Sequence, residues 1–329
     1  MRPFRYERAT DAASAVALVS ADPDARFLGG GTNLVDLMKL GVERPGLLVD
    51  VSGLERSGIE VLADGGLRIG AQVRNSDLAV DPLVRERFPV LSQALLSGAS
   101  GQLRNAATVG GNLLQRTRCL YFQDVTKPCN KRAPGTGCPA RAGEHRDMAI
   151  LGTSDACIAT HPSDLAVALT ALDARVNVVG VDGVRTVPVT ELYRLPGAEP
   201  ERDTVLQHGE LIERIDVPPS SFATRSAYRK VRDRASFAFA LVSVAAALDV
   251  ADGAVQDVRV ALGGVAPRPW RATSAEAALR GRPATAANFV DAISAELEAA
   301  APLPGNAFKV PLARNVVARV LEDLAEATR

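Results

Sequence analysis

The 329-residue sequence contains no apolar run of about 18 residues, so it predicts no membrane-spanning helix. Its first residues, Met1-Arg2-Pro3-Phe4-Arg5-Tyr6-Glu7, are too polar for the apolar core of a signal peptide. The formal net charge is zero, which gives no bulk attraction to nucleic acid or to an acidic substrate. We therefore expect a protein with no export signal of its own, cytoplasmic unless a signal-bearing partner takes it to the periplasm.

Cysteine is absent from most of the chain: all four cysteines, Cys119, Cys129, Cys138 and Cys157, fall within 39 residues. Nine, eight and eighteen residues separate them, so there is no C-x-x-C pair typical of structural zinc, and the ferredoxin spacings are also missing. The intervening prolines and glycines indicate a shaped, irregular loop. From the pattern alone, a 4Fe–4S cluster, a zinc ion, disulfides and free thiols all stay open.

Basic residues surround these cysteines. Since nearby cations favour the thiolate, we expect lowered thiol pKa values in this segment. The basic residues are Arg116, Arg118, Lys127, Lys131, Arg132, Arg141 and Arg146.

A glycine-rich turn lies between an expected strand at 26–28 and an expected helix at 34–40. Backbone N–H groups in such a turn, followed by a helix N-terminus, are typical of a phosphate-binding site. The alternative is a tight turn that simply needs positive φ. The spacing matches neither the Rossmann fingerprint nor the Walker A loop. The turn reads Leu28-Gly29-Gly30-Gly31-Thr32-Asn33-Leu34.

A second glycine turn, Thr108-Val109-Gly110-Gly111-Asn112, precedes the cysteines, and Ser163-Asp164 follows them at the start of an apolar, helical run. Ser or Asp at that position first suggests a helix N-cap. Two glycine turns in one domain favour a shared ligand as long as a dinucleotide. The sequence shows no acid–base or nucleophile constellation for substrate chemistry.

The remaining pattern predicts an α+β protein of two domains. Hairpins are expected at 59–70 and 176–187, with helices at 11–20, 76–80 and 90–96 and a strand at 210–217. Pro218-Pro219-Ser220-Ser221 suggests a boundary near residue 222, and a subdomain split is expected near residue 57. The last part reads as a sheet backed by helices at 275–279, 287–300 and 311–327.

Taken in order, these motifs resemble the flavin-carrying subunit of the molybdenum hydroxylases, the family of xanthine dehydrogenase, aldehyde oxidoreductase and carbon monoxide dehydrogenase. The two glycine turns match its first and second FAD loops, and Pro162-Ser163-Asp164 matches the third. The segment from Ala261 to Ala272 matches the signature of its C-terminal domain. The resemblance covers nearly the whole chain.

The cysteine stretch departs from most of that family. It resembles the subset whose flavin subunit carries an extra 4Fe–4S cluster, and looks closest to bacterial periplasmic aldehyde oxidoreductase. The resemblance implies a two-part FAD-binding domain of the PCMH (vanillyl-alcohol oxidase-like) type at 1–222, with a 4Fe–4S loop at 113–160. A smaller α+β domain of the CO dehydrogenase flavoprotein C-terminal type follows at 223–329.

The resemblance also implies the roles of individual residues. The N–H groups of Gly29–Asn33 and Gly110–Asn112 would hold the FAD phosphates, with Leu28, Leu34 and Thr108 in the same loops. Ser163 and Asp164 would contact FAD, Asp164 through a sugar or ribityl hydroxyl, and Lys230 would be a further flavin contact. Cys119, Cys129, Cys138 and Cys157 would ligate the cluster.

The implied function is electron relay in a heterotrimer. A partner chain would hold the molybdenum cofactor and oxidise an aldehyde, and a 2Fe–2S subunit would pass electrons to this chain and on to an external acceptor. The alternatives are a subunit of an aromatic-CoA reductase or xanthine dehydrogenase-like enzyme, a zinc-stapled assembly module without redox function, and a stand-alone flavin oxidase.

Overall fold

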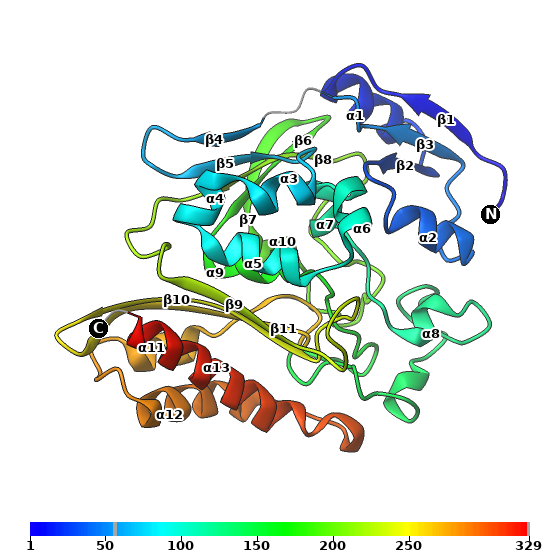
Figure 1. Cartoon of the computed structure of the whole chain (residues 1–329). Coiled ribbons are helices and arrows are strands. Elements are labelled where there is room, and N and C mark those ends of the chain that lie inside the picture. The colour runs from blue at the N-terminus through cyan, green and yellow to red at the C-terminus, as the bar shows by residue number, and fades with distance from the viewer. Residues whose placement is uncertain (55–57, 328–329) are drawn as a thin grey trace.

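The computed structural model describes residues 1–54 and 58–327, which form three sheets with helices around them (Figure 1). The first sheet is parallel, in the order β1-β3-β2, and buries its strands against α1. Asp11 caps α1 by accepting from the Ser14 N–H, and the Ser14 hydroxyl accepts from the Asp11 N–H in return. The bounds are β1 (Arg5–Arg8), α1 (Ala12–Ser20), β2 (Ala25–Leu28), α2 (Leu34–Lys39) and β3 (Leu47–Asp50).

The second sheet has five antiparallel strands in the order β4-β5-β8-β6-β7. Its strands are β4 (Ile59–Val61), β5 (Leu67–Gly70), β6 (Arg175–Gly180), β7 (Gly183–Pro188) and β8 (Leu211–Val217). One face packs on short helices, α3 (Asn75–Val80), α4 (Pro82–Arg87), α5 (Pro89–Ser97), α6 (Gly101–Ala106), α7 (Val109–Leu113), α9 (Asp164–Ala171) and α10 (Val189–Leu192).

The third sheet is antiparallel, in the order β12-β11-β10-β9, and α11, α12 and α13 cover one of its faces (Figure 1). Its strands are β9 (Ser226–Val231), β10 (Val242–Ala251), β11 (Ala254–Gly263) and β12 (Trp270–Arg271). The helices are α11 (Thr273–Leu279), α12 (Ala286–Glu296) and α13 (Lys309–Glu326).

Helices α5 and α9 lie between the second and third sheets, and strands of the third sheet pack directly against them (Figure 1). Every residue of α9 from Leu165 to Ala171 is buried. One hydrophobic core therefore contains residues of both sheets, including Ile215 from β8 and Ala245 from β10. This packing holds the start of α9, where Asp164 lies, in a defined position relative to β9.

The cysteine segment projects from the side of the molecule beside α2 and carries α8 (Leu120–Gln123) (Figure 1). Short 3-10 turns at Pro139–Arg141, Leu297–Ala299 and Pro304–Asn306 complete the described elements. Lys309 is fully buried, and its Nζ donates to the carbonyls of Asp147, Met148 and Gly264. This ammonium group ties the cysteine segment, at a point between Cys138 and Cys157, to the start of α13.

Both expected hairpins, the helix at 11–20 and the helix-backed C-terminal sheet are present, so the α+β prediction is confirmed. The prediction of a glycine turn at 108–112 is wrong, because Val109–Leu113 forms a short helix that Thr108 caps. The expected subdomain split near residue 57 falls outside the described residues, and the division near 222 stays a prediction. No helix in the described part of the chain is long and apolar enough to cross a membrane.

Candidate functional site

The first glycine loop presents free backbone donors. Within the described residues, none of the N–H groups from Gly29 to Asn33 donates to another protein group. Gly31 has φ +72°, a conformation that favours glycine. Gly30 packs so tightly on the neighbouring loop that a Cβ would lie 2.0 Å from the Ala106 carbonyl oxygen. The loop is thus held against the protein on one side while its amides stay available on the other.

The second motif differs from the first. The N–H groups of Gly110 and Asn112 donate to the carbonyls of Ala71 and Thr108 at 2.9 and 2.8 Å, and the Gly111 N–H donates to the Thr108 hydroxyl at 3.2 Å. These amides are therefore already engaged within the protein, and their role in holding the FAD phosphates stays a prediction. Gly110 packs closely on Ala71, since a Cβ at residue 110 would lie 3.0 Å from the Ala71 Cβ. The second motif therefore forms one wall of the site.

A buried polar cluster joins the third motif to the C-terminal domain. The Asp164 carboxylate accepts from Lys230 Nζ at 2.8 Å and from the Tyr228 hydroxyl at 2.5 Å. The side chains of Lys230 and Asp164 are only 3% and 10% exposed. Burial, followed by the adjacent Asp164, raises the pKa of Tyr228 well above its ordinary value, so this phenol stays protonated and donates.

Ser163 has two roles at the same place. Its hydroxyl caps α9 by accepting from the Ala166 N–H at 3.0 Å, and it donates to Asn112 Oδ1 at 2.6 Å. The third motif is therefore joined directly to the second.

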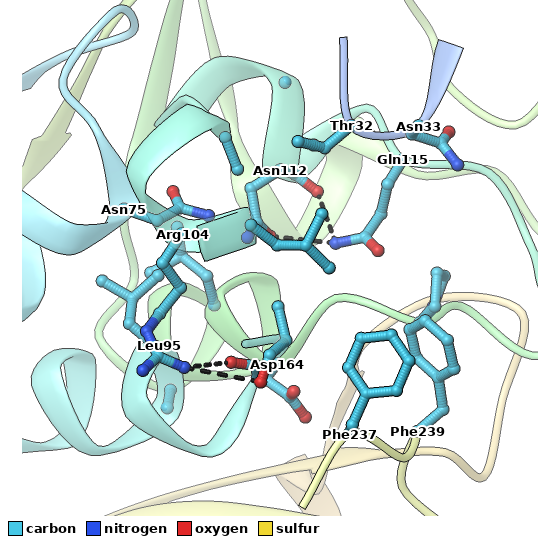
Figure 2. Close-up of a pocket in the computed structure, with 18 of the residues that line it drawn as sticks. Thr32, Asn33, Asn75, Leu95, Arg104, Asn112, Gln115, Asp164, Phe237 and Phe239 are labelled. Atoms are coloured by element: carbon cyan, nitrogen blue, oxygen red, sulfur yellow. Dashed lines mark hydrogen bonds between the residues drawn. The ribbon is translucent and has the colours of Figure 1, made fainter. Parts of the chain in front are cut away.

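Two cavities meet at the first glycine loop. One, of about 190 Å³, is lined by Asp164, Lys230 and two partly exposed aromatic residues, Phe237 and Phe239 (Figure 2). The other, of about 470 Å³, lies over the glycines. Thr32, Asn33 and Gly111 line both. Their sizes suit a long, two-ended small molecule, because ligand sites commonly measure roughly 300–1,000 Å³.

Three buried amide atoms in these cavities have no partner in the described structure: Asn33 Nδ2, Gln72 Oε1 and Asn75 Oδ1. A buried polar atom without a partner costs free energy, so such a group is expected to meet a ligand. Together with the free amides of the first loop, they match a polar dinucleotide such as FAD.

Nearly all sequence-predicted contact residues line these cavities. Leu28 is the exception among the glycine-loop residues, because it ends β2 and lines neither. Ser163 lines an adjoining cavity of about 220 Å³ that it shares with Asp164 and Cys119. The residues lining the first two cavities are Gly29, Gly30, Gly31, Thr32, Asn33, Leu34, Thr108, Gly110, Gly111, Asn112, Asp164 and Lys230.

The four cysteines line one small cavity of about 10 Å³, together with Asn130 and Lys131. All four are free thiols, and Cys119, Cys129 and Cys157 are buried. The disulfide alternative is thus not what the structure shows. Among the described residues, no group of three or more His, Cys, Asp or Glu side chains is arranged so that it could hold a metal ion. The thiols share a cavity without converging on one point.

The expected lowering of thiol pKa values is wrong for two cysteines. Burial raises the pKa of Cys119 to about 11, and burial also raises the pKa of Cys157 despite the nearby Lys131. The basic residues act elsewhere: Arg132 donates to the carbonyls of Tyr121, Phe122 and Lys127, which braces the loop.

Sequence reasoning missed several residues that line the site, among them Gln72, Asn75 and Asp203. Asp203 contacts both Arg116 and Lys131. Burial alone would raise the pKa of Asp203, but these two cations outweigh it and lower the pKa. No local motif surrounds these three residues, and only the fold brings them to the cavities.

Comparison with known proteins agrees with this geometry. Residues 2–220 match the FAD binding domain in molybdopterin dehydrogenase, and residues 226–324 match the CO dehydrogenase flavoprotein C-terminal domain. The chain belongs to this family: it is an FAD-binding medium subunit of the molybdenum hydroxylases, an oxidoreductase flavoprotein subunit. The family resemblance of the sequence motifs is therefore confirmed.

The chain is similar to several individual members of this family. The chain is 51% identical over 325 residues, 98% of each protein, to the aldehyde oxidoreductase FAD-binding subunit PaoB of Escherichia coli K12. It is 27% identical over 273 residues to the glyceraldehyde dehydrogenase medium chain of Sulfolobus acidocaldarius, covering 83% of this chain and 79% of that one. A carbon monoxide dehydrogenase structure from Hydrogenophaga pseudoflava superimposes with a TM-score of 0.76 and 27% identity over 99% of both chains.

Proposed function

We propose that this chain is the FAD and 4Fe–4S electron-transfer subunit of a heterotrimeric, molybdenum-dependent aldehyde oxidoreductase. The 51% identity to an aldehyde oxidoreductase FAD-binding subunit supports the substrate class. The observation that carries the cluster assignment is that all four cysteines of the chain line one small cavity. Partner chains hold the molybdenum cofactor and the 2Fe–2S clusters, and the aldehyde is oxidised there.

The chain's own residues bind and orient the cofactors, whose redox chemistry is supplied by FAD and the cluster once they are bound. The free amides of Gly29–Asn33 hold the FAD diphosphate, and the two cavities on either side of them take its two ends. Asn33 Nδ2, Gln72 Oε1 and Asn75 Oδ1 gain their missing partners. The Lys230–Asp164 pair borders the smaller cavity, where Asp164 still has lone pairs for a ligand hydroxyl.

Four thiolates are the ligand set of a 4Fe–4S cluster. Cys119, Cys129, Cys138 and Cys157 supply it here. A single zinc ion is less expected, because four-cysteine structural zinc sites usually contain C-x-x-C pairs and this chain has none.

The test is to purify the complex with its partner chains and to measure flavin, iron and zinc per chain. We expect one flavin and about four irons on this chain. Cys129→Ser should lose the roughly four irons of this chain but keep the iron of the 2Fe–2S subunit, whereas Ala133→Ser, an exposed change in the same loop, should keep both. Zinc in place of iron, or a complex with neither flavin nor metal, would refute the assignment.

Substrate assays on the complex separate the remaining alternatives. Turnover of aldehydes, with none of purines or aromatic-CoA thioesters, supports the aldehyde oxidoreductase. Purine turnover would support a xanthine dehydrogenase-like enzyme, and reduction of an aromatic-CoA thioester would support an aromatic-CoA reductase.

A further inference from the structure

Asn33, in the first glycine loop, is oriented by the cysteine segment. Its Oδ1 accepts from the backbone N–H of Arg116 at 2.9 Å, three residues before Cys119. With Oδ1 engaged, Nδ2 is the amide atom left to donate, and it is buried without an acceptor at the wall shared by the two cavities. The donor that faces the dinucleotide site is thus set by the position of the Arg116 backbone.

The Arg116 side chain is held from several directions. Its guanidinium donates to Glu43 Oε1 at 2.7 Å and to Asp203 Oδ2 at 2.8 Å. It also lies 4.7 Å from the centroid of the Phe122 ring, on α8 between the first two cysteines. The group is about one-fifth exposed, so these contacts are little screened by solvent.

Lys131 extends this network to the four-cysteine cavity, which it lines. Two residues after Cys129, its Nζ donates to Asp203 Oδ1 and, at 2.6 Å, to the Pro200 carbonyl. Its side chain is 8% exposed. The Asp203 carboxylate therefore binds Lys131, from the cysteine segment, with one oxygen and Arg116 with the other.

We propose that Lys131, Asp203 and Arg116 are positioning residues that couple the conformation of the cysteine loop to FAD affinity through Asn33. This inference rests on the proposed function, since it takes FAD as the ligand. Coupling between two sites is reciprocal. When the cluster orders the cysteine loop, the chain therefore binds FAD more tightly, and bound FAD in turn stabilises the ordered loop.

The test is FAD rebinding to the purified complex after its flavin has been removed, followed by flavin fluorescence, with iron content measured in parallel. Lys131→Met should raise the Kd about tenfold, which corresponds to about 1.4 kcal/mol. Lys131→Arg should restore most of the affinity. Lys127→Met, an exposed lysine in the same loop, should leave the Kd unchanged.

The Asp203→Asn variant distinguishes an effect of positioning on the Kd for FAD from an effect of charge alone. It also replaces Lys131→Met as the test if that variant does not fold. Loss of a carboxylate beside the diphosphate site would by itself lower the Kd, whereas a weaker hold on Arg116 should raise it. A lower Kd in Asp203→Asn would overturn the proposal.

A double-mutant cycle tests the route through Asn33. In an Asn33→Ala background, Lys131→Met should change the Kd by less than about twofold, because the positioned donor is already gone. Full additivity of the two effects would overturn the proposal. An unchanged Kd in a folded Lys131→Met protein would do the same while leaving the proposed function intact. If the unmodified complex bound neither FAD nor iron, the proposed function would fail first.

Discussion

The buried pair of Lys230 and Asp164 gives the sharpest stability prediction. Lys230→Met removes the ammonium and leaves the Asp164 carboxylate, only 10% exposed, with the Tyr228 hydroxyl as its remaining protein donor. Breaking one side of such a pair costs about 3–5 kcal/mol, because an uncompensated charge stays buried. We expect that loss in the free energy of unfolding of the flavin-free chain.

The measurement is urea unfolding of the flavin-free protein, because bound FAD would add its own stabilisation. Trp270, the single tryptophan, lies on β12 in the same sheet as Lys230 and reports unfolding of that part by fluorescence. As a control, Lys127→Met at an exposed position should change stability by less than about 0.5 kcal/mol.

The double variant Lys230→Met/Asp164→Asn decides whether the buried charge is the cause. The amide keeps an acceptor for Tyr228 but carries no charge, so more than half of the lost stability should return. If Lys230→Met cost less than about 1 kcal/mol, or if the double variant were no more stable than the single one, the charge-burial reasoning would be refuted.

Two further predictions follow from the loops around the site. Gly30→Ala should abolish FAD binding, because the new Cβ would lie 2.0 Å from the Ala106 carbonyl oxygen. Gly101→Ala should bind FAD normally, because no atom lies within 4 Å of the Cβ position at residue 101. Equal flavin occupancy in the two variants would contradict this packing argument. Burial lowers the pKa of His161 to about 4, so the unfolded chain, with a histidine pKa of about 6.5, takes up the proton first as pH falls. Relative to His161→Gln, the native protein should lose about 3 kcal/mol of stability between pH 6.5 and pH 4; a pH-independent difference in urea unfolding would count against this.

The first glycine loop could be predicted from sequence because its signals are local. A strand, a run of three glycines and a helix follow one another without interruption, and backbone chemistry alone makes that run a donor-rich turn. The clustering of four cysteines is equally visible in the chain. Hairpins such as the one at 176–187 follow from Asp182-Gly183 between two apolar, β-branched runs.

The second motif shows where such reasoning fails. Two adjacent glycines suggest an open turn, but Thr108 can cap a helix, and here its hydroxyl accepts from the Gly111 N–H. Asp203 lies 72 residues from Lys131 in the sequence, so the local sequence around either residue does not predict their contact. The raised thiol pKa values depend on burial, which spacing in the sequence does not reveal.

The placement of α9 has a consequence for dissecting the protein. Because its residues from Leu165 to Ala171 are covered by β10 and β11 on one side and by the larger sheet's helices on the other, a fragment ending near residue 222 would expose an apolar helix to water. The same cut would leave Asp164 without Lys230 and Tyr228. Expressed without the C-terminal sheet, the FAD-binding half should therefore expose this apolar helix and aggregate.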